Sequence, residues 1–168
     1  LDEWFEDAPF LGIHLGVLRA HTDDIMPGDT FVAYEDRYVP QALARGAAWI
    51  LKEGPWAQSG PVLSVPDLSA RLTQAFITRF PQGMALVGVT GTNGKSSVCH
   101  FLAQAWAQLN RRPVMMGTLG VGEYPDLSPS RLTTLDALTL HQHLWAWASR
   151  PCAIECSSHA LTQSRLVG

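Results

Sequence analysis

The first half of the sequence, residues 1–81, consists of short apolar segments separated by turn signals. Runs of adjacent apolar residues predict buried strands, because strands covered on both faces carry few polar positions. Two other segments repeat apolar residues every three or four positions, which is the helical period. We expect one of these helices to end at Gly46, and Asp67 precedes the other as a candidate cap. The predicted strands are 30–34, 47–51 and 61–65, and the predicted helices are 39–46 and 68–80.

The second half alternates strand and helix patterns more clearly, after a break at 81–83 where we place a domain boundary. The order strand, helix, strand, helix, strand predicts a parallel α/β sheet with right-handed crossovers. Prolines and glycines in 120–132 predict an irregular loop. The predicted strands are 84–89, 113–117 and 152–156, and the predicted helices are 95–109 and 136–147. The first of these helices is expected to bury Val98, Leu102, Ala105, Trp106 and Leu109.

Composition narrows the class of protein. Of 168 residues, 46% are hydrophobic and 16% are charged, and the formal net charge is −3. This weak negative charge argues against bulk electrostatic binding to nucleic acid or to an anionic membrane. Cys99, Cys152 and Cys156 form no C-x-x-C pair, which predicts reduced thiols. Cys152 and Cys156, four positions apart near an apolar run, are interpreted as buried small hydrophobic side chains, and a metal site is the alternative. No apolar run approaches the ~20 residues of a membrane helix. We expect a cytoplasmic monomer.

A phosphate-binding loop is the strongest chemical signal in the chain. Residues 90–97 read Thr-Gly-Thr-Asn-Gly-Lys-Ser-Ser, between a predicted buried strand and a predicted helix. Glycines let the backbone approach phosphate oxygens, and successive N–H groups converge on the anion at the helix N-terminus. Lys95, one of two lysines beside ten arginines, would contact the outer phosphates, and Ser96 would offer a hydroxyl to Mg²⁺. The strict G-x-x-x-x-G-K-S pattern fails only at its first glycine, which is Val89; the alternative is a glycine-rich turn.

Glu155 ends the last predicted strand. Ligands of open α/β sheets bind at the carboxyl ends of strands, so Glu155 is placed to hold Mg²⁺ directly or through water. The alternative is a capping or salt-bridging glutamate. Ser157-Ser158-His159 could also be interpreted as a nucleophile and base, but the sequence has no nucleophile elbow. The predicted fold class is α/β, with a small N-terminal α/β domain over 1–81 and part of a P-loop parallel-sheet ATPase domain over 82–168.

Several stretches of the chain together resemble the Mur ligases. In the first half the matching stretches are 27–33 and 40–48, and in the second half they are 90–96, 117–120, 133–134 and 155–161 with Gln163 and Arg165. The Glu-x-Ser-Ser-His-Ala-Leu segment is similar to the branch of the family that forms the tripeptide of peptidoglycan. The nucleotide loop by itself is less specific, because folylpolyglutamate and cyanophycin synthetases share it.

This resemblance implies an ATP-dependent amide ligase. ATP would phosphorylate a carboxylate of a UDP-muramyl-peptide acceptor, and the amine of an amino acid would then attack the acyl phosphate. Mg²⁺ and Lys95 would neutralise the developing phosphoryl charge. By likeness, Lys95 and Glu155 are catalytic, and Ser96 and Glu155 hold Mg²⁺. The residues expected to bind ATP are Gly91, Thr92, Asn93, Gly94, Lys95, Ser96 and Ser97, and those expected to contact the acceptor are Thr133, Thr134, Ser157, Gln163 and Arg165.

Departures from the family pattern lie mostly on the acceptor side. Ser96-Ser97 replaces a pair of threonines and keeps the hydroxyl, whereas Leu135 replaces a proline and 21–23 lacks the arginine of the family's Asp-Ser-Arg. Neither lysine fits the carbamylated lysine of the family, so we expect the front part of a larger ligase, inactive alone. Two alternatives stay open: a related ligase with a different acceptor, and a non-catalytic nucleotide-binding module.

Overall fold

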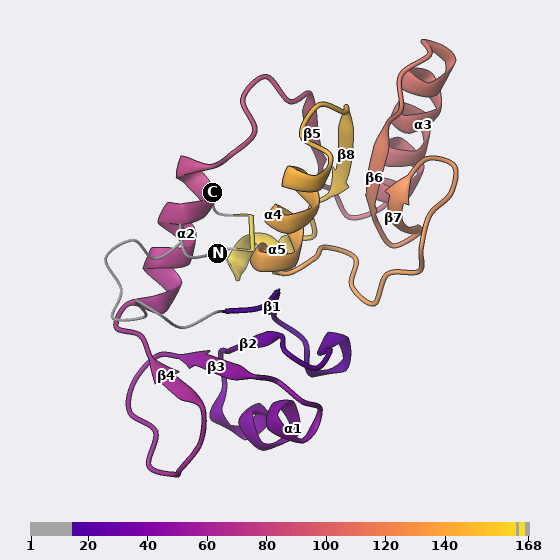
Figure 1. Cartoon of the computed structure of the whole chain (residues 1–168). Helices are drawn as coiled ribbons and strands as arrows, with labels where there is room; N and C mark the ends of the chain where they lie inside the picture. The colour runs from indigo at the N-terminus through magenta and orange to yellow at the C-terminus, as the bar shows by residue number, and fades with distance from the viewer. Residues whose placement is uncertain (1–14, 164, 167–168) are drawn as a thin grey trace. The chain divides into compact units, whose positions relative to one another are not determined.

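The computed structural model describes residues 15–163, 165 and 166, and Figure 1 traces their course. The chain divides into two compact units between Thr78 and Arg79. Both units combine helices with a sheet that is wholly or mostly parallel, so the predicted α/β class is confirmed. The assignment of the first domain to the acceptor and of the second to ATP stays a prediction.

The first unit is built on a four-stranded parallel sheet in the order β1-β2-β3-β4. Phe31, Val39 and Ile50 lie in its buried core. All three predicted strands and both predicted helices are present, and Gly46 follows the first helix with a φ of 92°. The elements are β1 (Leu18–Arg19), η2 (Thr22–Asp24), β2 (Thr30–Ala33), η3 (Asp36–Tyr38), α1 (Val39–Ala44), β3 (Trp49–Lys52), β4 (Val62–Ser64) and α2 (Leu68–Thr78).

Lys52, at the end of β3, is a buried structural residue of this first unit. It is only 3% exposed. Its Nζ lies 2.9 Å from Oδ1 of Asp36 and donates to the carbonyl oxygen of Pro55 at 2.9 Å. The ammonium also lies 5.6 Å from the centre of the Trp56 ring. A buried ammonium needs such partners, and here they join the loops that follow β2 and β3.

The second unit is built on a sheet in the order β5-β8-β6-β7. Strands β5, β8 and β6 are parallel, as the sequence predicts. Helix α4 begins after Asp136, whose Oδ1 accepts a hydrogen bond from the N–H of Thr139 at 3.0 Å. The elements are β5 (Leu86–Val89), α3 (Lys95–Gln108), β6 (Val114–Gly117), β7 (Gly120–Glu123), α4 (Ala137–Ala146), β8 (Cys152–Glu155) and α5 (Ser158–Thr162).

Strand β7 corrects the prediction of an irregular loop over 120–132. It pairs antiparallel with β6, and Gly117 lies opposite Gly120. The two glycines of β7 serve a close approach of the chain, because a Cβ on Gly120 would lie 2.7 Å from the carbonyl oxygen of Ser128. Val121 and Ser128 form a bridge at this point. Glycine in a strand marks a close backbone approach here, not the end of regular structure.

Helix α3 has the predicted bounds within one residue, but it presents a different face to the core. Cys99 and Ala103 are buried, whereas Val98 is 46% exposed and Leu109 is 71% exposed. Cys99 packs with Met115 and Ala153 of the sheet. Small side chains let the helix lie close to the strands, so the buried face is turned away from the larger apolar residues that the pattern favoured. Of the five residues predicted to be buried, Leu102 and Trp106 are partly buried and pack against this core.

All three cysteines are free and buried, which confirms the interpretation of Cys152 and Cys156 as small hydrophobic side chains. Burial raises the pKa of the Cys99 thiol, which also faces Glu155 and Cys156, to about 12. Burial likewise raises the pKa of the Cys152 thiol to about 12. Thiols with such pKa values carry almost no thiolate at neutral pH and are therefore weak nucleophiles and weak metal ligands.

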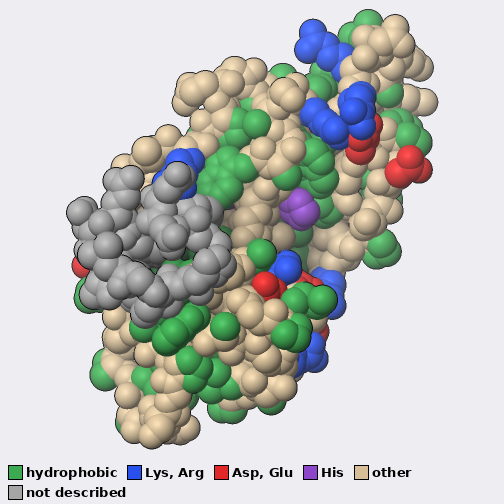
Figure 2. Space-filling model, in the orientation of Figure 1, with side chains coloured by type: hydrophobic (Ala, Val, Ile, Leu, Met, Phe, Trp, Pro, Cys, Tyr) green, Lys and Arg blue, Asp and Glu red, His purple; other side chains and the backbone are tan. Residues whose placement is uncertain are grey.

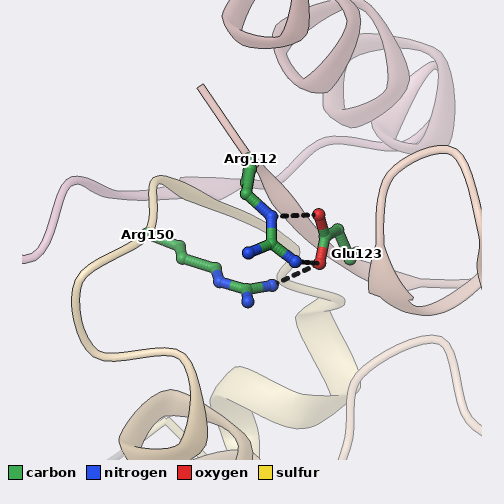
Figure 3. A network of polar contacts seen from close by, with 3 residues as sticks. All are labelled: Arg112, Glu123 and Arg150. Carbon is green, nitrogen blue, oxygen red and sulfur yellow. Dashed lines mark hydrogen bonds and ion pairs between the residues drawn. The ribbon is translucent and has the colours of Figure 1, made fainter. Parts of the chain in front are cut away.

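A network of two arginines and a glutamate holds the antiparallel strand to its neighbours (Figure 3). Arg112, which precedes β6, donates from Nε and Nη2 to the two carboxylate oxygens of Glu123 at 2.6 and 2.7 Å. Arg150, which precedes β8, donates to the same carboxylate at 2.6 Å. The hydrogen bond from Arg112, with help from Arg150, lowers the pKa of Glu123. This network lies where β6 and β8 begin, at the opposite ends of these strands from Gly117 and Glu155.

Charge is sparse on the visible surface. Figure 2 shows one face on which hydrophobic and uncharged side chains predominate and charged side chains gather in a few places. No helix within the described part of the chain is long and apolar enough to cross a membrane. A site that binds a highly charged ligand must therefore draw its charge from a few well-placed residues.

Candidate active site

The carboxyl ends of three parallel strands meet at one edge of the second sheet. β5 leads into the phosphate loop, β8 ends at Glu155, and β6 ends at Gly117. Val89 pairs in register with Glu155, and the N–H of Cys156 donates to the carbonyl oxygen of Val89 at 2.8 Å. The start of the loop and Glu155 are therefore separated by one strand spacing. This is the edge at which open α/β sheets bind their ligands.

The phosphate loop has the backbone that its glycines predict. Gly94 has a φ of 79° and stands at the N-cap of α3 without a side-chain capping bond. Thr92, Asn93 and Ser97 are exposed, and Ser96 is half-buried. The Nζ of Lys95 donates to the carbonyl oxygens of Gly91 at 2.8 Å and Thr92 at 3.4 Å. The N–H groups of the first turn of α3 are thus free to meet an anion, and the lysine lies folded over its own loop.

Lys95 pairs with no carboxylate of the described residues, since its contacts are with the two carbonyl groups. A carbonyl oxygen is a weaker partner for an ammonium than a phosphate oxygen, because only the phosphate carries net charge. Lys95 can therefore exchange its loop carbonyls for an incoming phosphate without breaking an ion pair.

Glu155 is a buried carboxylate that is held by neutral donors. It is 1% exposed. Its Oε1 accepts a hydrogen bond from the backbone N–H of Thr118 at 2.8 Å, and its Oε2 lies 3.2 Å from the hydroxyl oxygen of Thr118. No Lys or Arg within the described residues forms an ion pair with it. Burial of an unpaired negative charge costs free energy, so this position favours a cation as a ligand.

Thr134 joins the loop before α4 to the end of β8. It is 5% exposed, and its hydroxyl donates to the carbonyl oxygen of Glu155 at 2.7 Å. The hydroxyl oxygen of Thr134 in turn accepts a hydrogen bond from the N–H of Ser157 at 3.0 Å. Ser157 in turn caps α5, because its hydroxyl accepts the N–H of Ala160 at 3.2 Å. The guanidinium of Arg165 donates to the carbonyl oxygen of Thr134 at 3.1 Å.

Comparison with known proteins decides the family. Residues 89–168 match the Mur ligase middle domain. A UDP-N-acetylmuramoyl-L-alanyl-D-glutamate--2,6-diaminopimelate ligase from Xylella fastidiosa strain Temecula1 is 44% identical over 165 residues, which cover 86% of this chain and 32% of the relative. A solved structure of a ligase of the same name matches with a TM-score of 0.70 at 28% identity, over 99% of this chain and 37% of that one.

The chain belongs to the Mur ligase family. It spans about a third of the length of the relatives that it matches. The MurF ligase from Thermotoga maritima, solved in complex with ADP, has a TM-score of 0.50 at 18% identity over 84% of this chain and 32% of that one, which is a likeness of fold. The resemblance read from the sequence is thereby confirmed.

The structure of this Mur ligase chain brings most of the predicted acceptor residues into one network. Thr134, Ser157 and Arg165 are joined by hydrogen bonds, and the hydroxyl of Thr133 lies 3.2 Å from that of Thr118. Gln163 is the exception, since it stands exposed at the C-cap of α5. Because its hydroxyl bonds within the protein, Thr134 fastens the loop. Contact of these five residues with the acceptor stays a prediction.

The sequence pattern indicates no role for Thr118 and predicts no helix after Glu155. The structure shows that Thr118 provides both donors to Glu155 and that Ser157 begins a short helix, α5. The signal for Thr118 was the match at 117–120, but only the parallel pairing of β6 with β8 shows which carboxylate it meets. Five residues of α5 are too few for a helical period to be visible in the sequence.

The donor set at this edge of the Mur ligase sheet fits Mg²⁺. Glu155 and Ser96 offer oxygen ligands, which hard cations prefer, and the carboxylate uses only part of its acceptor capacity on Thr118. Within the described residues no three His, Cys, Asp or Glu side chains gather into a metal site. Mg²⁺ usually binds through one or two carboxylates together with substrate phosphates, so one buried carboxylate beside a phosphate loop suits a metal that arrives with a nucleotide.

Proposed function

We propose that this chain forms the nucleotide site and part of the acceptor site of an ATP-dependent ligase that joins an amino acid to a UDP-muramyl peptide. The observation that carries the proposal is the pairing of Val89 with Glu155, which sets a phosphate loop beside a buried carboxylate that has no cationic partner among the described residues. The match of residues 89–168 to the Mur ligase middle domain supports the same reading.

The reaction places two negatively charged groups in contact. The γ-phosphoryl group of ATP passes to the acceptor carboxylate, which gives an acyl phosphate and ADP. The amine then attacks the acyl carbon, the amide bond forms, and phosphate leaves. The loop N–H groups bind the phosphates, and Lys95 moves from the carbonyl oxygens of Gly91 and Thr92 to the transferring phosphoryl group. Glu155 and Ser96 would hold Mg²⁺, whose positive charge would offset the repulsion between carboxylate and triphosphate.

The acceptor side of the site is the loop that carries Thr133 and Thr134, together with Ser157, Gln163 and Arg165. Arg165 uses one of its five N–H donors on Thr134, so the others are available to a phosphate or carboxylate of the acceptor. The Thr134 hydroxyl donates to the carbonyl oxygen of Glu155 and accepts from the N–H of Ser157, and these two bonds hold the loop beside Glu155. A carboxylate bound by this loop would therefore lie close to Glu155.

A second candidate is a ligase of the same chemistry with a different acceptor. The family's Asp-Ser-Arg is replaced here by 21–23, which lead into and form part of η2. Asp23 in this segment pairs with Arg45 at 2.6 Å. Titration of the chain with UDP-N-acetylmuramoyl dipeptide and, separately, with UDP measures whether the usual acceptor is still bound.

Thermal unfolding with Mg-ADP tests the nucleotide site. At 100 times the dissociation constant, a bound ligand stabilises a protein by ~2.7 kcal/mol, so the melting temperature of the wild-type chain should rise. Lys95→Ala should abolish the rise. Arg111→Ala is the matched control, because it removes one positive charge from an exposed position in the same unit and should leave the rise intact. Equal shifts in wild type and Lys95→Ala would contradict the proposal.

A further inference from the structure

Thr118 holds the Glu155 carboxylate with two different donors. It follows Gly117, the last residue of β6, and is separated from Glu155 by 37 positions in the sequence. The backbone N–H of Thr118 reaches Oε1 at 2.8 Å, and the Thr118 hydroxyl lies 3.2 Å from Oε2. Both carboxylate oxygens are therefore tied to one residue, and the orientation of the carboxylate plane depends on that residue.

The direction of the hydrogen bonds follows from the chemistry of the groups. A carboxylate only accepts, so the single hydroxyl proton of Thr118 goes to Oε2 of Glu155. The hydroxyl of Thr133, at 3.2 Å from that of Thr118, must then donate to the Thr118 oxygen. The result is a chain of donors from Thr133 through Thr118 to Glu155. The loop predicted to contact the acceptor and the carboxylate predicted to hold Mg²⁺ are joined by this chain.

Gly117 also limits the position of the carboxylate. A methyl group at this position would clash with the carboxylate of Glu155, and its Cβ would lie 2.6 Å from both Cγ and Cδ of the glutamate. The Glu155 side chain therefore lies directly against the backbone at Gly117. Packing against Gly117 and the two donors from Thr118 together define one position for the carboxylate.

We propose that Thr118 is a positioning residue for the Mg²⁺ site at Glu155, and that its hydroxyl links this site to Thr133 on the acceptor side. The inference rests on the proposed function, because it takes Glu155 as the residue that meets the metal. Without the hydroxyl, one carboxylate oxygen loses its donor while the backbone N–H still holds the other. Groups that orient metal-binding carboxylates usually change metal affinity by ~10–100-fold when they are removed.

The test measures how strongly Mg²⁺ tightens the binding of ADP to the full chain. Dissociation constants for ADP are measured by calorimetry with Mg²⁺ and with EDTA, and their ratio is compared among variants. Thr118→Val keeps the size of the side chain and the backbone donor, and should lower the ratio by about tenfold or more, while binding in EDTA changes less than about twofold. Thr118→Ser retains a hydroxyl and should restore most of the ratio.

Two further variants make the result specific. Thr133→Val removes only the outer donor of the chain, so it should lower the ratio by less than Thr118→Val. Thr78→Val is the matched control, because it makes the same chemical change at an exposed hydroxyl that bonds to the carbonyl oxygen of Gln74 in the other unit. Its ratio should equal that of wild type. Binding of Mn²⁺ to the ADP complex, followed by electron paramagnetic resonance, should fall in the same order.

Three results would overturn the inference, and they are distinguishable. If Thr118→Val keeps the wild-type ratio, the hydroxyl does not position the metal carboxylate, although the proposed function stands. If Thr118→Val weakens ADP equally with Mg²⁺ and with EDTA, the hydroxyl supports the local structure only. If wild type binds no ADP in either condition, the proposed nucleotide site fails and the inference fails with it.

Discussion

Replacement of Gly117 by alanine tests the closeness of β6 to the Glu155 side chain. The new Cβ would lie 2.6 Å from Cγ and Cδ of Glu155, where ordinary contacts of a Cβ begin at 3.4 Å. The glutamate must therefore move by nearly an ångström, which strains its bonds to Thr118. Overpacking of this kind costs about 1–3 kcal/mol of unfolding free energy. If the unit Arg79–Val167 unfolds by itself, each kcal/mol corresponds to a fall of about 4–8 °C in its melting temperature.

A double-mutant cycle with Glu155→Ala identifies the cause. Urea unfolding is measured for wild type, Gly117→Ala, Glu155→Ala and the double variant. If the clash with the carboxylate is the source of the cost, Gly117→Ala should cost about 1–3 kcal/mol in the wild-type background and close to nothing when Glu155 is alanine. An equal cost in both backgrounds would refute the reasoning, because the methyl group would then be opposed by something other than Glu155.

Two further predictions follow from the hydrogen bonds of the second unit. The hydrogen bond from Arg112 is the main cause that lowers the pKa of Glu123 in the folded chain below its ordinary value of 4.5. The stability that this carboxylate contributes is therefore fully present above that ordinary value and is lost as the pH falls through the lower, folded pKa. Urea unfolding should therefore show Glu123→Gln to be less stable than wild type at pH 7, with a gap that closes in acid; a gap that stays constant with pH would contradict this. Thr134→Val should cost about 1–3 kcal/mol in the same assay, because it leaves the buried carbonyl group of Glu155 without its donor, whereas the exposed change Thr162→Val should cost little.

The elements that the sequence predicts well are those whose local pattern and buried environment agree. The continuous apolar run of 84–89 contains β5, and the alternation of elements predicts the parallel pairing of β5, β8 and β6. The predicted helix over 136–147 contains α4, because a helical period follows Asp136 directly. In each of these cases the signal lies within a few residues of the element that it specifies.

The features that could not be predicted depend on contacts between segments that the local sequence pattern does not connect. The glycines of β7 look like loop residues, but their lack of a Cβ serves the passage of 126–128 alongside the strand. The buried face of α3 is set by the fit of the small residues Cys99 and Ala103 against the sheet. The positions of the large apolar residues in the sequence do not reveal this fit. Thr118 becomes part of the site only because β6 lies next to β8.

The central claim is that a metal-assisted nucleotide site lies at the edge where β5 and β8 end. The most direct test is a calorimetric titration of the chain with ADP, with Mg²⁺ and with EDTA, for wild type and for Glu155→Gln. Mg²⁺ should tighten ADP binding to wild type, and Glu155→Gln should lose this tightening while it still binds ADP in EDTA. Equal tightening by Mg²⁺ in both proteins would mean that Glu155 plays no part in holding the metal and that the proposed site is wrong.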